Sequence, residues 1–144
     1  NQTYTYDADA GTVTATYGNA TAKAHADTLW TAQDETDGKG TEGEVATRGL
    51  KYNFIKTIKA QAAGILQDTD WYILRKADAD TDVPSAITTF RAAVRTKAAA
   101  METLITNASN TAAIETLYTY VNTADEGDPV VMERPLGEFP VLGS

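Results

Sequence analysis

Cysteine is absent from this 144-residue chain, and histidine occurs once, as His25. Without cysteine, the chain can form no disulfide, no thiolate metal site and no cysteine nucleophile. A single imidazole cannot make a cluster of histidine ligands, and it leaves one candidate for histidine acid–base catalysis. We therefore expect no cofactor and no metal ion, and most classes of enzyme are disfavoured.

Long apolar runs and an excess of positive charge are also missing. No stretch approaches the roughly 18 apolar residues of a membrane-spanning helix, and residues 1–4 lack the pattern of a signal peptide. The net charge is −8, which argues against binding to the phosphate backbone of a nucleic acid. We expect neither a membrane nor a nucleic acid as a partner.

The composition suits one domain with a basic centre. Hydrophobic residues make up 42% of the chain, enough for a single core. Residues 45–106 carry nine bases and six acids, a net charge of +3, whereas residues 1–44 and 107–144 have net charges of −6 and −5. We interpret the acidic ends as solvated, or as folded near the basic middle.

Residues 3–17 alternate threonine with tyrosine, valine and alanine on either side of a turn sequence at residues 7–11. This alternation predicts a β-hairpin. A single hairpin is only marginally stable in water. We therefore expect it to dock on the rest of the chain or to pair with another chain.

The segment after the hairpin gives a weaker pattern. Residues 20–33 place Leu29 and Trp30 on one face of a short predicted helix. Residues 34–43 are polar and contain three glycines, which predicts a loop. With the hairpin, these segments form the first of three predicted regions, residues 1–43.

Apolar residues at intervals of three and four predict helices over residues 44–67, 85–106 and 111–121. Pro84 suits the start of the second helix, because a backbone N–H in the first turn has no partner within the helix and its absence costs no hydrogen bond. The first two helices each carry an apolar stripe. We expect them to pack antiparallel, with the third helix alongside, as a helical domain over residues 44–121.

The third region, residues 122–144, is an acidic tail in which prolines and glycines recur. Its composition predicts an extended chain with a short strand near residues 130–132. The predicted fold class is therefore mainly α: a helical hairpin plus a third helix, with an N-terminal β-hairpin and an extended C-terminal tail.

Asp78, Asp80 and Asp82 alternate as at the start of a calcium-binding loop. That loop needs glycine at its sixth position and glutamate at its twelfth, for a sharp turn and for bidentate ligation. Val83 and Thr89 stand at those positions. We interpret the segment as a solvated loop.

The turn between the first two helices is the most distinctive part of the sequence. Two arginines, Arg91 and Arg95, lie four residues apart and so share one face of the second helix. We expect the indole of Trp71 to plug the open end of the hairpin and Asp70 to pair with Arg91 or Arg95. The candidate structural or interface residues are Asp70, Trp71, Arg91, Arg95 and Trp30, and we name no catalytic residue.

The tryptophans allow one alternative. Trp30, Trp71 and the seven tyrosines have flat rings that can stack on sugars, although such residues more often anchor a core or an interface. A carbohydrate-binding module is therefore an alternative function.

A spaced pattern resembles a known domain. It consists of Leu66, Thr69-Asp70-Trp71, Pro84, Phe90-Arg91 and Val94-Arg95. It is similar to the small domain of tail assembly chaperones and tail-fibre-associated proteins of tailed bacteriophages, over residues 48–106. In this chain Val94 replaces the usual leucine, the link between the helices is longer and more acidic, and a third helix and a tail follow.

The resemblance implies a non-enzymatic virion protein of the phage tail, in the baseplate or the tail-fibre attachment region. Such a protein would act by oligomeric packing, with other tail or tail-fibre proteins and further copies of itself as partners. It would reside in the virion tail, and in the host cytoplasm during assembly. The resemblance also allows a tail-fibre assembly chaperone that is absent from the mature virion.

Overall fold

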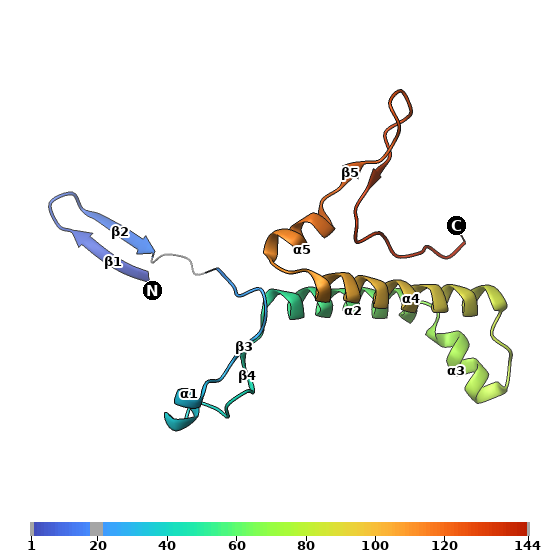
Figure 1. Ribbon diagram of the computed structural model, residues 1–144, viewed down its shortest axis with the longest axis horizontal. Coiled ribbons are helices and arrows are strands. Elements are labelled where there is room, and N and C mark those ends of the chain that lie inside the picture. Colours follow the sequence, from blue (N-terminus) through green and yellow to red (C-terminus); the bar gives the residue numbers. More distant parts are fainter. Residues whose placement is uncertain (1, 18–21, 144) are drawn as a thin grey trace.

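The computed structural model describes residues 2–17 and 22–143 (Figure 1). Two long helices, α2 (Leu50–Gln67) and α4 (Ser85–Asn107), lie side by side at its centre. The described residues also form three shorter helices and three two-stranded antiparallel sheets. This arrangement confirms the predicted fold class, which is mainly α with an N-terminal β-hairpin.

The central pair is antiparallel, as the two apolar stripes predict. Lys51, near the start of α2, donates from Nζ to the carbonyl of Thr106, near the end of α4, at 2.7 Å. The Nζ of Lys59, about two turns further along α2, lies 3.3 Å from a carboxylate oxygen of Glu102, about one turn earlier in α4. The buried core between the helices consists of Ile58, Ala62, Val94, Ala98, Met101 and Ile105. Each large apolar side chain buried here contributes about 1.5–3 kcal/mol.

The first predicted helix begins later than expected. Residues 45–47 do not join it but form the strand β4 (Val45–Thr47), which pairs with β3 (Thr28–Leu29). Gly49 is the N-cap of α2, and its N–H donates to Asp27 at 2.7 Å. The backbone of the segment before β3 therefore covers the start of α2.

The helix predicted over residues 20–33 is wrong over its described part, residues 22–33. Within it the chain is extended at β3, and a helix, α1 (Ala32–Thr36), begins only afterwards and enters the predicted loop. Thr31 and Asp34 form a capping box, in which each side chain accepts from the other residue's backbone N–H. This cap fixes the helix start after Thr31 rather than before it.

The solvated loop predicted around Asp78, Asp80 and Asp82 is partly wrong, because Asp78 lies in a helix. A helix, α3 (Asp70–Ala79), follows α2 after a two-residue break. It ends at Asp80, whose φ of 49° is left-handed, a common way for a helix to stop. Trp71 and the apolar residues 72–74 therefore belong to a separate, angled helix (Figure 1).

The third predicted helix is α5 (Thr111–Tyr118), which ends before residue 121. It packs at the end of the central pair, where the rings of Tyr118 and Phe54 lie 5.0 Å apart. The chain then forms β5 (Val121–Asn122), which pairs with β6 (Met132–Glu133). The predicted strand near residues 130–132 is present with a shift of about two residues.

The tail returns to the helices after β6. The N–H of Leu136 donates to the carbonyl of Leu117 at 3.0 Å, and the side chain of Leu136 is fully buried in the core. Phe139 packs against the same core. The tail is extended, as predicted, but it does not extend freely away from its own subunit.

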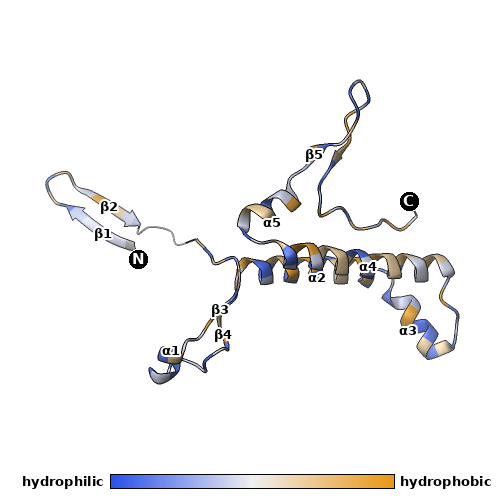
Figure 2. Cartoon of the chain, viewed as in Figure 1, coloured by the Kyte–Doolittle hydropathy of each residue, from blue (hydrophilic) through white to orange (hydrophobic). Residues whose placement is uncertain are grey.

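The N-terminal hairpin consists of β1 (Gln2–Asp7) and β2 (Thr12–Tyr17) in antiparallel register. Its turn is closed by Asp7, whose Oδ1 accepts from the N–H groups of Asp9 and Ala10, and by Gly11 at a φ of 64°. Apolar residues are found on β2 and α3 as well as on the central pair (Figure 2).

Candidate functional site

Arg91 closes the end of the helical hairpin. This side chain of α4 is 7% exposed, and its Nη1 donates to the carbonyl of Leu66 at 2.8 Å and to Oγ1 of Thr69 at 2.6 Å. Its Nη2 lies 2.8 Å from Oδ1 of Asp70. The structure thus places Asp70 against Arg91, one of the two partners expected for it.

The end of α2 explains why a cation belongs at this position. The last carbonyls of a helix have no partner within the helix, and they carry partial negative charge. The carbonyl of Leu66 accepts from the N–H and the hydroxyl of Thr69 as well as from Arg91. Arg91 therefore caps α2 and, through Asp70, also holds the first turn of α3.

The prediction that Trp71 plugs the hairpin is wrong, because its side chain is 48% exposed. The guanidinium of Arg91 occupies the closing position, and Trp71 lies in the first turn of α3, which leads away from the central pair. The indole stacks on Tyr72, with 3.8 Å between ring centroids, and under the guanidinium of Arg75 at 4.8 Å. With Ile73 and Leu74, also exposed, it leaves α3 with an uncovered apolar surface.

The other two predicted site residues lie apart from this network. Arg95 is exposed and forms no ion pair with any described residue. Trp30 belongs to the loop before β4, near the opposite end of α2, and its backbone pairs with Glu44 and Gly43. A Cβ on Gly40 would lie 2.3 Å from the indole nitrogen, so Trp30 serves to pack this loop.

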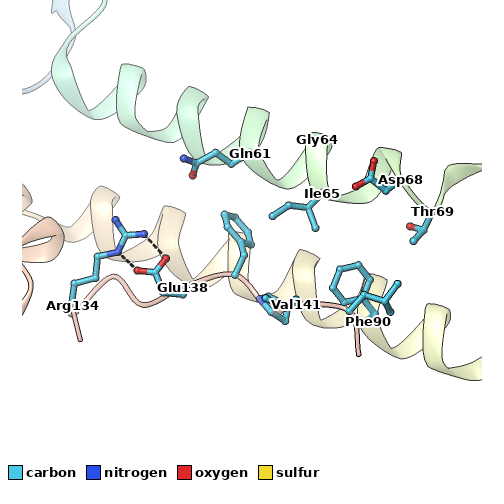
Figure 3. Close-up of a pocket in the computed structure, with 12 residues that line it drawn as sticks. Gln61, Gly64, Ile65, Asp68, Thr69, Phe90, Arg134, Glu138 and Val141 are labelled. Atoms are coloured by element: carbon cyan, nitrogen blue, oxygen red, sulfur yellow. Dashed lines mark hydrogen bonds and ion pairs between the residues drawn. The ribbon is translucent and has the colours of Figure 1, made fainter. Parts of the chain in front are cut away.

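A groove that the sequence analysis missed lies between α2, α4 and the tail (Figure 3). This tail groove has a volume of about 770 Å³. Its walls are mainly apolar, with polar groups from α2 and an ion pair of the tail at the edges. The residues that define it are Gln61, Ile65, Asp68, Phe90, Phe139 and Pro140.

Two features shape the tail groove. Gly64 faces it without a side chain, and a Cβ built there would meet no atom within 4 Å. At one end Arg134 binds Glu138, with Nε 2.7 Å from Oε1 (Figure 3). A hydrogen bond from the hydroxyl of Tyr120, together with Arg134, holds the pKa of Glu138 below its usual value. The tail groove exists because the tail folds back onto the helices. The one signal for this in the sequence was the pair of apolar residues, Leu136 and Phe139, among prolines and glycines.

The N-terminal hairpin presents a second apolar surface. The register places tyrosines, valine and alanine on one face and threonines on the other. We call the first the tyrosine face; it consists of Tyr4, Tyr6, Val13, Ala15 and Tyr17. Its tyrosines and valine are each more than 60% exposed, and no hydrogen bond or ion pair joins the described hairpin to the other described residues.

Comparisons with protein-family models, curated proteins and solved structures found no match to this chain. In the part of the chain that the structure describes, no three metal-ligating side chains gather into a cluster. Over the same residues, no helix combines the length and apolarity needed to cross a bilayer. The function therefore has to be inferred from the surfaces described above.

Proposed function

We propose that this chain is a non-enzymatic structural protein that acts by packing against other protein chains. The observation that carries the proposal is its surface area. The chain exposes 10268 Å² to solvent, whereas a compact monomer of its 15.4 kDa exposes about 7200 Å². The excess of roughly 3000 Å² lies in the range that subunits of stable assemblies bury against one another.

The chemical character of the exposed surface supports the same conclusion. Large apolar side chains are exposed on the hairpin, on α3, on the β5–β6 arm and at the end of the tail. Single exposed apolar residues are ordinary, but contiguous groups of them mark interaction sites. Examples are Tyr4, Tyr6, Tyr17, Trp71, Leu74, Val130, Val131 and Val141.

The setting that we propose is the tail of a bacteriophage, in the baseplate or the tail-fibre attachment region. The support is the resemblance over residues 48–106, of which Thr69, Asp70 and Arg91 form one bonded unit. On this proposal the chain resides in the virion tail, and in the host cytoplasm during assembly. Mass spectrometry of washed virions should find its peptides at a level comparable to other tail proteins. Virions without them would refute this setting.

The same resemblance also supports a tail-fibre assembly chaperone. A chaperone would bind the fibre protein through these surfaces and then leave. A pull-down from infected cells would recover a tail-fibre protein, while the washed virions would lack the chain. A pull-down without any fibre protein would dismiss this alternative.

The exposure of Trp71 favours one further candidate, a carbohydrate-binding module. Its half-exposed indole lies beside Tyr72 on α3, and exposed aromatic rings can stack on sugars. A glycan array would give a signal that Trp71→Ala removes. An array without signal would eliminate this candidate.

A further inference from the structure

The tyrosine face needs a surface to cover it. A two-stranded hairpin is only marginally stable by itself, and here one face is aromatic while the opposite face carries the threonines Thr3, Thr5, Thr12, Thr14 and Thr16. Such one-sided patterning is typical of a sheet that buries its apolar face. The helical body of the same chain does not cover it, since Tyr4, Tyr6 and Tyr17 are all largely exposed.

The tail groove offers a surface of matching chemistry. Ile65, Phe90 and Phe139 give it apolar walls. Its polar edge includes the side chains of Gln61 and Asp68, which form no hydrogen bond with another described residue. Tyrosine combines an apolar ring with a hydroxyl group that usually forms a hydrogen bond when it is buried. Tyrosine rings in this groove would bury their apolar parts and bring their hydroxyls to an amide and a carboxylate.

We propose that the tyrosine face of one copy docks into the tail groove of a second copy. The inference rests on the proposed function, because it names a partner for a chain that acts by packing. Both surfaces are present on every chain, so each copy gives a hairpin and receives one. Reciprocal docking closes a dimer, and serial docking builds a ring or a filament.

Surface area favours this arrangement over the pairing of two hairpins. One face of a hairpin of two six-residue strands, at about 3.4 Å per residue and about 5 Å between strands, covers on the order of 200 Å². A stable interface takes about 800 Å² from each partner. A groove that encloses the tyrosine rings buries their edges as well as their outer ends. In the proposed assembly each chain also buries two surfaces, its tyrosine face and its tail groove, so more area is buried than in a pair of hairpins.

The test measures the mass of the full chain in solution by analytical ultracentrifugation. Gly64→Leu adds a bulky side chain to the α2 side of the tail groove, where a Cβ meets nothing within 4 Å, and it replaces a mid-helix glycine by a better helix former. We expect this variant to sediment as a 15.4 kDa monomer, whereas the wild type sediments at two or more times that mass. The matched control, Ala63→Leu, adds the same side chain at an exposed position of α2 outside the groove and should keep the wild-type mass.

The second variant removes the other half of the contact. Tyr4→Thr, Tyr6→Thr and Tyr17→Thr together keep strand-forming residues but remove the aromatic rings. We expect a monomer, while Thr3→Ser, Thr5→Ser and Thr16→Ser on the opposite face should retain the wild-type mass. Mixing the tyrosine variant with Gly64→Leu should restore a complex of one copy of each, because one retains the groove and the other the hairpin.

Three results would overturn the inference: a monomeric wild type at all concentrations, a Gly64→Leu variant with the wild-type mass, or a mixture that forms no complex. Hairpin-to-hairpin pairing would produce the second of these results. These failures are separate from failure of the proposed phage setting, which the virion measurement tests. A chain found in virions whose Gly64→Leu form assembles normally would keep its structural role and lose this particular contact.

Discussion

The central helix pair and the N-terminal hairpin follow from equally clear sequence patterns, yet they bury very different amounts of apolar surface. In the helix pair, Val94, Met101 and Ile105 are fully buried. On the hairpin, Tyr6 and Val13 face each other across the strands and both remain mostly exposed. Periodicity therefore predicts the element in both regions, whereas burial depends on whether the chain supplies its own counter-surface. Buried apolar surface is concentrated in one region and uncovered apolar surface in the other.

The largest effect should come from opening a cavity in the helix pair. Met101→Ala removes a fully buried side chain from the core and should lower the free energy of unfolding by about 2–5 kcal/mol. Tyr6→Ala, on the hairpin, should change the unfolding of the helices by less than about 0.5 kcal/mol in the monomeric Gly64→Leu background. Urea denaturation followed by circular dichroism measures both. Equal effects would contradict the division between the two regions.

Loss of the Arg91 cap should come next. Arg91→Ala removes bonds from a cation to Leu66, Thr69 and Asp70 and should cost about 1.5–3 kcal/mol, as for hydrogen bonds to charged groups. The matched control is Arg95→Ala, one turn away and exposed, which should cost less than about 0.5 kcal/mol. Trp71→Ala should also cost less than Arg91→Ala, because its indole is not buried. If urea denaturation showed a larger loss of stability for Trp71→Ala than for Arg91→Ala, the indole rather than the guanidinium would close the hairpin.

A smaller, stabilising effect is expected in the middle of α2. Gly64 lies in the helix interior with open space around it, so Gly64→Ala should raise the free energy of unfolding by about 0.8–1 kcal/mol. The gain comes from helix propensity alone, since a methyl group there contacts nothing. Thermal melts in the background of Tyr4→Thr, Tyr6→Thr and Tyr17→Thr, whose hairpin should not dock in the groove, would detect it, and a destabilised variant there would contradict the open space around Gly64.

The smallest effect concerns the loop that carries α1. Hydrogen bonds from Thr31, with help from Lys39, lower the pKa of Asp34 from 3.8 to about 2. A lowered pKa in the folded state means that the carboxylate stabilises the cap above pH 3.8 and loses that contribution as the pH falls towards 2. An NMR titration should give this low pKa, and Thr31→Val should shift it back towards 3.8. An unchanged pKa in that variant would show that Thr31 is not the cause.

Much of the fold could be predicted because helices repeat their apolar residues at a fixed interval. The central pair follows from that rule. The hairpin register follows from the alternation of side chains between the two faces of a strand. The placement of Trp71 could not be predicted in the same way. A run of four apolar residues, 71–74, does not reveal which face is covered, and the start of α3 at Asp70 turns that run away from the core.

The candidate site could be predicted only where charges lie at helical spacing. The sequence indicated that Asp70 would pair with Arg91 or Arg95, which lie beyond the same turn, and the structure selects Arg91. It did not indicate the tail groove, since Leu136 and Phe139 lie in a segment without periodicity. Their burial depends on contacts with Leu117 and the central pair, which are distant in the chain, so the two apolar residues alone do not reveal where they pack.

The double attachment of Arg91 has a mechanical consequence. One guanidinium bonds the last turn of α2 and the first turn of α3 while its own backbone belongs to α4. The two residues between α2 and α3 would otherwise act as a free joint. Arg91 holds that joint from α4, so the direction of α3, and with it the exposed surface of Trp71, Ile73 and Leu74, is tied to the central pair through one side chain.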